Sequence, residues 1–480
     1  MTAPGNAASD PVKQLRKEMG FWDVLLFNIA AVLGPRWIAA AAHNGTSSIS
    51  LWILSALFFF VPTAFVITEL STRFPHEGGL YVWSKEAFGD FHGFVAGWTY
   101  WIYSVFYFPG LLLASASMGA YIGGPSWAHL AQSRPFLLGG SFFLLFIAVA
   151  MNIVGLNIGK WLQNAGGVMT YFPLLLLAGT AGIVWLKYGS VTHYTWHNIL
   201  PVWNVDTVNF WPQIIFAFAG LELVSAMSDE IRDPQRTLAR AIWGSGIMIA
   251  VIYVIGTFAV LAVLQDTQVD PKSGVFQALT VASTTLKIGL VGMIAAFLVT
   301  FGNAGGVGTT VAGLSRVPFI VGVDRYLPAA FGKIHPKWRT PYISILVQAI
   351  ISLALLLLSN INETTSGAYQ ILIDAATILY FLPFLYMYAA VIKLYARKDR
   401  EENPHAVLIP GKKFGVWLAG GIGFVITFVA IVLSFFPPGE SSNRLLFSVK
   451  LVSGTVGSIA IGLILYYRGV RAKARDAQQA

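Results

Sequence analysis

Three charged side chains, Arg36, Glu222 and Asp374, lie inside long apolar segments of this sequence. A charge at the centre of a bilayer costs roughly 2.5 to 3.5 kcal/mol on insertion scales, so each of them must face a cavity or a partner. The Arg36 guanidinium could bind a substrate carboxylate, form an ion pair with Glu222, or lie near the membrane interface. Glu222 could accept a proton or form an ion pair, and Asp374 could have a coupling or a structural role.

Two breaks in the apolar pattern accompany Arg36 and Glu222. The first comprises Leu33, Gly34, Pro35 and Arg36, and the second comprises Phe216, Ala217, Phe218, Ala219, Gly220, Leu221 and Glu222. Lipid offers no water to a broken backbone, so such breaks occur only where protein covers them or where they line a cavity. Paired breaks in the two halves of a chain indicate the substrate site of a secondary transporter. Half-helix amino ends would attract a carboxylate, and unwound carbonyls would accept from an ammonium group.

Side chains near the breaks extend this candidate binding site. Phe216 and Phe218 could cover a bound side chain, and Phe216 is therefore a candidate gate. Ser104 and Phe108, on the third apolar segment, complete the predicted substrate-binding set.

The composition requires membrane-spanning elements to position these residues. With 56% hydrophobic and 11% charged residues, the 480-residue chain cannot be a soluble domain with a polar surface. Stretches able to cross about 30 Å of hydrocarbon predict an all-α integral membrane fold of about twelve transmembrane helices. These stretches lie at residues 21–43, 50–72, 91–123, 136–155, 163–187, 209–231, 239–264, 281–313, 342–360, 368–394, 414–437 and 445–468.

The distribution of basic residues predicts the orientation of the chain. Most of the 31 Lys and Arg residues lie in segments that would share one side with the N-terminus, and Arg36 alone lies within a span. Since cytoplasmic loops attract Lys and Arg, the sequence predicts a multi-pass protein of the cell membrane with both termini cytoplasmic. The net charge of +9 is then a topology signal and predicts no nucleic-acid partner.

Several kinds of chemistry lack support in the sequence. The chain has no cysteine, which excludes disulfides and thiolate ligands. Its eight His residues lack metal-site spacing and no nucleotide-binding P-loop motif is present, so no metal, cofactor or enzyme activity is predicted. The glycines at 305–308 lie within an apolar span, where close helix packing is their expected role. A membrane-embedded enzyme and a channel remain the competing classes of protein.

The position of the breaks also predicts an internal repeat. Each break lies in the first helix of a possible five-helix unit, and an odd number of crossings would invert the second unit. The expected divisions are a cytoplasmic segment at 1–20, repeats at 21–187 and 209–394, two added helices at 414–468, and a cytoplasmic tail at 469–480.

Several motifs resemble the amino acid-polyamine-organocation permeases. They are ELSTRFP at 69–75, EGGLYVW at 77–83, FAFAGLE at 216–222 and DEIRDPQR at 229–236. SR at 315–316, DRYLPAAF at 324–331, IPGKK at 409–413 and SFFPP at 434–438 look closest to the bacterial glutamate/GABA antiporter branch. The resemblance implies a leucine-transporter-like 5+5 inverted repeat with two further helices, and amino acid binding between helices 1 and 6.

The sequence departs from that family pattern at two functional positions. The first break of relatives usually reads Gly-Ser/Thr-Gly, whereas here it reads Gly34-Pro35-Arg36. The fifth helix has Thr170 about where some proton-coupled relatives carry a lysine, so Thr170 joins Phe216, Glu222 and Asp374 as a gating or coupling candidate.

These observations predict a secondary active transporter that moves amino acids by alternating access. Its partners would be a small amino acid substrate, membrane lipid, and a proton or counter-substrate, with transport by exchange or proton-coupled uptake. The alternative is a cationic amino acid or polyamine transporter, which is favoured if Glu222 and Asp374 face the cavity and Arg36 points away.

Overall fold

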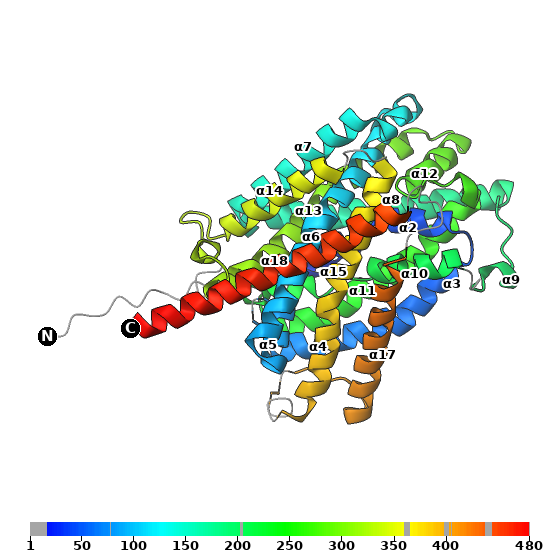
Figure 1. Ribbon diagram of the computed structural model, residues 1–480. Coiled ribbons are helices and arrows are strands. Elements are labelled where there is room, and N and C mark those ends of the chain that lie inside the picture. Colours follow the sequence, from blue (N-terminus) through cyan, green and yellow to red (C-terminus); the bar gives the residue numbers. More distant parts are fainter. Residues whose placement is uncertain are drawn as a thin grey trace.

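The computed structural model describes residues 17–479, except residues 77, 202–204, 360–364, 398–402, 405 and 437–443. The described secondary structure is helical apart from one isolated bridge between Met19 and Ile231. Figure 1 shows the helices side by side in one bundle, with α18 on its outside and the C-terminal end of that helix extending past its neighbours. The expected all-α fold is confirmed.

Ten described helical segments are long and apolar enough to cross a membrane, by their length and composition. The shorter apolar helix α14 and the interrupted pair α10 and η4 bring the crossings to the expected twelve. The crossing elements are α1 (Phe21–Val32), α2 (Pro35–His43), α3 (Ser48–Ser55), η2 (Ala56–Phe60), α4 (Val61–Arg73), α6 (Asp90–Gly119), α7 (Arg134–Val154), α8 (Leu156–Tyr188), α10 (Val205–Ala217), η4 (Leu223–Glu230), α11 (Pro234–Val263), α13 (Leu290–Val323), α14 (Tyr342–Ser359), α15 (Thr365–Lys393), α17 (Lys412–Leu433) and α18 (Arg444–Gln479). The shorter helices between them include α5 (Leu80–Phe88), α9 (Trp196–Ile199) and α12 (Gly274–Thr285).

The spans differ in how deeply they lie within the bundle. The most apolar 18-residue stretch of the segment formed by α1 and α2 is 89% buried inside the protein. The corresponding stretch of α18 is only 17% buried. The outward-facing helices have apolar surfaces that suit lipid, while α1, α6 and α15 form the interior. The first predicted break, between α1 and α2, is therefore enclosed by protein.

The first predicted break is confirmed. Helix α1 ends at Val32 and α2 begins at Pro35, with Leu33 and Gly34 extended between them. Proline suits the first position of a helix because its missing N–H would have no partner there, and its ring excludes continuation of the preceding helix. The sequence Gly-Pro therefore ends one half-helix and starts the next.

The second predicted break is confirmed as well. Helix α10 ends at Ala217, and η4 begins only at Leu223. Gly220 has a φ of +119°, which residues with a side chain rarely adopt. A Cβ atom at Gly220 would also approach the Val32 side chain to 3.0 Å. The two breaks are therefore in contact, and a glycine is needed where they meet.

Glycines hold α13 close to its neighbours, as expected from their position in the sequence. A Cβ atom on Gly305 would lie 2.5 Å from the Gly166 Cα atom of α8, and one on Gly306 would lie 2.7 Å from the Ala30 carbonyl oxygen of α1. Small residues permit such approach of helix backbones in membranes. The glycine-rich stretch thereby brings α13 against the first break.

Two predicted boundaries differ from the structure. The span expected at 281–313 is instead α13 at Leu290–Val323, because Lys287 adopts a positive φ of 59° that separates α12 from α13. The last span, expected at 445–468, is part of the longer helix α18 at Arg444–Gln479, which continues through the predicted tail. Its Ala, Arg, Lys and Gln residues have high helix propensity.

Candidate functional site

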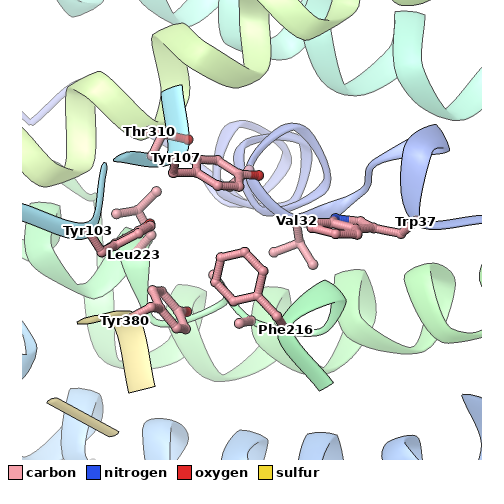
Figure 2. A pocket seen from close by; sticks show the side chains of 11 residues that line it. Val32, Trp37, Tyr103, Tyr107, Phe216, Leu223, Thr310 and Tyr380 are labelled. Carbon is pink, nitrogen blue, oxygen red and sulfur yellow. The ribbon is translucent and has the colours of Figure 1, made fainter. Parts of the chain in front are cut away.

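A small enclosed cavity lies where the two breaks meet (Figure 2). Its walls come from the end of α1, the start of α2, the end of α10 and the second break, together with α6, α13 and α15. The labelled side chains of Figure 2 that face it include Trp37, Tyr103, Tyr107, Phe216, Thr310 and Tyr380. The space open to the centres of water molecules is about 20 Å³, which is room for roughly one water. This conformation of the site is closed.

Phe216 occupies the middle of an aromatic cluster in the cavity (Figure 2). Its ring meets those of Trp37 and Tyr107 edge to face, each at a centroid distance of 5.7 Å, and that of Tyr380 at 5.2 Å. Such edge-to-face pairs are favourable beyond the area that they bury. Phe216 therefore contacts three helices at once, a position that suits the gating role predicted for it.

Tyr253 of α11 joins the two breaks. Its hydroxyl lies 2.9 Å from the Val32 carbonyl oxygen and 3.0 Å from that of Ala217, and it accepts a hydrogen bond from the Gly34 N–H at 3.3 Å. Since Tyr253 is fully buried, no water can replace these contacts. One side chain thus stabilises backbone groups that neither broken helix can satisfy.

Arg36 lies in the first turn of α2, beside the cavity. Its Nη2 donates to the Tyr107 hydroxyl at 2.5 Å, and its guanidinium carbon lies 4.3 Å from the Trp37 ring centroid. Arg36 is 2% exposed, so its side chain is enclosed by the protein. Among the described residues no ion pair joins Arg36 to Glu222, so the pairing considered for them is wrong for this conformation.

Glu222 is held by hydroxyl groups. Its Oε1 accepts from Tyr100 at 2.7 Å and from Tyr380 at 2.6 Å, and its Oε2 accepts from the Gly220 N–H at 3.1 Å. Only 1% of Glu222 is exposed, so these contacts must offset the loss of water. Because Tyr380 also lines the cavity, one hydrogen bond links Glu222 to the cavity wall.

The other predicted binding residues lie at different distances from the cavity. Ala219 and Gly220 belong to its wall, as Phe216 does. Phe218 packs instead against Trp52, Phe60 and Tyr253. Three further predicted residues, Leu33, Ala217 and Phe108, are buried without belonging to the described lining.

Ser104 and the two remaining coupling candidates also lie away from the described lining. The Ser104 hydroxyl accepts a hydrogen bond from Gln348 at 2.7 Å. Asp374 is 6% exposed and accepts from Gln370, one turn earlier on α15, at 3.0 and 3.1 Å. Thr170 lies on α8, where a Cβ atom added to Gly302 would come 2.7 Å from its hydroxyl.

The tyrosines of the site are the main residues that the sequence reading missed. Tyr100, Tyr103 and Tyr107 are three and four residues apart, the spacing of one helix face, and all three lie on α6. That periodicity was available in the sequence. Tyr253 and Tyr380 carry no comparable signal, because each stands on a separate helix that only the fold brings to the breaks.

One end of the bundle is closed beneath the cavity. Arg316 of α13 forms an ion pair with Glu230 at the end of η4, with 2.8 Å between Nε and Oε1 and side chains 2% and 5% exposed. Next to this pair, the Met19 N–H donates to the Glu230 carbonyl at 3.1 Å, and the Arg232 N–H donates to the Met19 carbonyl at 2.9 Å. The segment before α1 therefore pairs with the chain after η4.

We expect Tyr253→Phe to weaken substrate affinity about tenfold while the protein still folds. The change leaves the Gly34 N–H without its acceptor, at a cost of roughly 1 to 3 kcal/mol, but keeps the ring stacked on Trp52 at 4.4 Å. Tyr388→Phe is the matched control, because that buried hydroxyl bonds Thr63 away from the breaks. Titration of each purified variant with substrate, with thermal stability as the readout, measures the two affinities. Equal affinities of Tyr253→Phe and Tyr388→Phe would contradict the role of Tyr253.

Three relatives of known or probable function align with most of the chain. The serine/threonine exchanger SteT of Bacillus subtilis is 26% identical over 406 residues, covering 82% of this chain and 86% of that protein. The probable agmatine/putrescine antiporter AguD of Lactococcus lactis is 22% identical over 457 residues, covering 94% and 95%. The glutamate/gamma-aminobutyrate antiporter of Lactococcus lactis is 22% identical over 400 residues, covering 82% and 78%.

A family profile and a solved structure agree with these relatives. The profile described as amino acid permease matches residues 19–456. The crystal structure of MhsT in complex with L-phenylalanine superimposes with a TM-score of 0.65 at 11% identity, covering 86% of this chain and 98% of that one. At this identity the match shows a shared fold, and it confirms the expected fold class.

Proposed function

Because the chain belongs to the amino acid permease family and is a secondary amino acid transporter, we propose that it binds its substrate between the two broken helices. Membership of this family confirms the resemblance seen in the sequence, including that to the glutamate/GABA antiporter branch. The observation that carries the proposal is the contact of both breaks at one enclosed cavity. Bare peptide groups, an arginine and aromatic rings all meet there.

The carboxylate of the substrate would lie at the start of α2. The amino end of this half-helix has a positive partial charge, and Arg36 adds a full charge in its first turn. A guanidinium can donate two parallel hydrogen bonds to a carboxylate. Arg36 already reaches the cavity-lining Tyr107, so a small movement of its side chain would bring it to a bound carboxylate.

The ammonium group of the substrate would lie toward α1 and the tyrosines. Ala31 and Val32 of the wall stand at the carboxyl end of α1, which has a negative partial charge. The rings of Tyr103 and Tyr380 line the same space and can attract a cation through their faces. Opposite ends of two half-helices would thus hold the opposite ends of a zwitterion.

Transport would require the cavity to open toward one side at a time. Its present volume of about 20 Å³ is too small for an amino acid, so Phe216 and the rings around it must separate on binding. We propose that the repeats at 21–187 and 209–394 move relative to one another in this step. Glu222 would sense the substrate through Tyr380, and Glu222, Asp374 and Thr170 are the proposed coupling residues for a proton or a counter-substrate.

We propose that the protein lies in the cell membrane with both termini in the cytoplasm. The excess of Lys and Arg in loops on that side supports this orientation. The closed end beneath the cavity, where residues 17–19 pair with residues 230–232, would then face the cytoplasm.

A polyamine or a decarboxylated amino acid is the second candidate substrate. Four aromatic residues of the wall, Trp37, Tyr103, Tyr107 and Tyr380, could surround a cation, and the probable agmatine/putrescine antiporter AguD aligns with 94% of the chain. Arg36 argues against it, because a second cation beside the cavity would repel such a substrate.

The test is counterflow into proteoliposomes with wild-type protein and Arg36→Ala. We expect saturable uptake of a labelled amino acid that is stimulated by unlabelled amino acid inside. Loss of a charge-assisted hydrogen bond of roughly 1.5 to 3 kcal/mol should weaken uptake by Arg36→Ala about ten- to hundredfold. Arg36→Lys keeps the charge without the paired donors, so its uptake should lie between that of the wild-type protein and that of Arg36→Ala. Unchanged uptake by Arg36→Ala would refute the carboxylate role, and uptake of putrescine in place of amino acids would favour the second candidate.

A further inference from the structure

A second and larger cavity lies far along the chain from the breaks. It is formed between the segment after α13 and the last third of α18, and it measures about 570 Å³ on the same scale. That volume falls in the range of small-molecule sites in proteins. Its lining includes Arg325, Leu327, Pro328, Leu465, Arg468 and Ala472. Neither the transported substrate nor the gating residues account for this cavity.

The lining combines positive charge with apolar walls. Among its described residues it has two arginines and no acid. Two acids lie next to the lining. Asp324 is bound by the Tyr81 hydroxyl and by Lys85, whose Nζ lies 2.6 Å away, and Asp90 lies 3.6 Å from the same Nζ. Burial lowers the pKa of Lys85, but the hydrogen bond and charge of Asp324, with the charge of Asp90, outweigh it and raise that pKa overall. Lys85 thus offsets the charge of its acidic neighbours, and the positive charge of the lining itself comes from Arg325 and Arg468.

The backbone places Arg325 at a position that glycine usually occupies. The Tyr326 N–H donates to the Val321 carbonyl at 3.1 Å, and the Arg325 N–H donates to the Gly322 carbonyl at 3.0 Å. This pair of bonds ends a helix in the Schellman pattern, whose penultimate residue must be left-handed. Arg325 accordingly has a φ of 60°. This helix end fixes the backbone of Arg325 at the edge of the cavity, whose lining includes Arg325.

The length of α18 would place the cavity at the depth of lipid headgroups. From Leu445, where the apolar part of α18 begins, to Arg468 the helix rises roughly 34 Å at 1.5 Å per residue, close to the thickness of the hydrocarbon core. Tyr467 and Val470 beside Arg468 are 56% and 38% exposed, so this stretch of α18 is at the protein surface. Figure 1 shows the same end of α18 extending past the bundle.

From these observations we propose that the cavity between residues 325–329 and 465–472 binds an anionic phospholipid. Arg325 and Arg468 would hold the phosphate, and Leu327, Pro328, Leu465 and Ala472 would contact the glycerol and the upper acyl chains. Basic pockets between helices at a membrane surface recognise acidic headgroups in this way. A soluble phosphate would gain nothing from the apolar walls. The lipid would link the segment after α13 to α18 on the outside of the bundle.

Native mass spectrometry of the purified full-length protein tests this site. Dioleoyl phosphatidylglycerol and dioleoyl phosphatidylcholine share their chains, so their difference measures the charge of the headgroup. We expect the wild-type protein to bind phosphatidylglycerol about thirtyfold more tightly, and Arg325→Gln with Arg468→Gln to abolish that preference. The matched control is Arg471→Gln with Arg475→Gln, which also removes two positive charges, but from positions of α18 outside the cavity lining. This control should keep the preference for phosphatidylglycerol.

Three outcomes would overturn the proposal. Equal binding of both lipids by the wild-type protein is one, and it decides the matter even if the double variant fails to fold. Equal weakening by the matched control would show a diffuse attraction instead of a site. Displacement of phosphatidylglycerol by millimolar glycerol phosphate would show a site for soluble phosphate. The transport assay is separate, so failure here leaves the proposed substrate site untouched.

Discussion

Glu222→Ala should reduce amino acid uptake at least a hundredfold. The change removes the acceptor of three buried donors, namely the hydroxyls of Tyr100 and Tyr380 and the N–H of Gly220. Each buried donor left without an acceptor costs roughly 1 to 3 kcal/mol. Even if neighbouring groups move to satisfy some of these donors, the second break would be intact in few molecules. Counterflow in proteoliposomes, corrected for the amount of folded protein, measures the effect.

Glu222→Gln separates the charge of this residue from its hydrogen bonds. The amide oxygen can still accept from both tyrosines, but its NH₂ group opposes the Gly220 N–H, so uptake by exchange should fall only about tenfold. If Glu222 carries a coupling proton, this variant should also lose the response of uptake to a pH gradient. Tyr100→Phe, which removes one donor and keeps the ring, measures the effect of losing one of these hydrogen bonds alone. Wild-type uptake by Glu222→Ala would show that the second break tolerates the loss of its carboxylate.

Glu230→Gln should open the closed end of the bundle. It leaves the buried guanidinium of Arg316 without its charged partner. Breaking a buried ion pair in this way typically costs 3 to 5 kcal/mol. The native chain has no cysteine, so a single Ser225→Cys change reports on access to η4 between the cavity and the ion pair. We expect its reaction with a soluble maleimide to become at least a hundredfold faster in the Glu230→Gln background.

Glu86→Gln provides the matched control for that experiment. Its ion pair with Arg397 has the same length of 2.8 Å, but the two side chains are 42% and 45% exposed. Exposed pairs contribute roughly 0 to 1 kcal/mol, so the rate of labelling should change less than about fivefold. If the cysteine of Ser225→Cys reacts equally fast with and without Glu230→Gln, the ion pair between Arg316 and Glu230 does not hold this end closed.

The breaks could be predicted from the sequence because they follow from local backbone chemistry. Gly-Pro cannot continue a helix. Gly220 and Glu222 interrupt an otherwise apolar segment, and such an interruption cannot face lipid, so protein must enclose it. Number and order of the spans follow from length and hydropathy in the same way. These properties depend on neighbours in the sequence, and the structure confirms them.

The partners of the charged residues could not be predicted in this way. Arg36 and Glu222 each follow a break, which made an ion pair between them a reasonable expectation. In the fold, however, α6 and α15 supply tyrosine hydroxyls that reach both residues first. Tyr253 is a similar case, since nothing near position 253 in the sequence indicates that its hydroxyl would contact residues 32, 34 and 217. Contacts between distant helices decide such pairings.

The most direct test is a cryo-EM structure of the protein with the amino acid that stabilises it most in a thermal-shift screen. We predict density for the ligand between residues 33–36 and residues 216–222, with its carboxylate next to the start of α2 and within reach of Arg36. The rings of Phe216 and Tyr380 should have moved apart to admit it. Ligand density at another place, with the two breaks still in contact around an unchanged cavity, would contradict the proposed site.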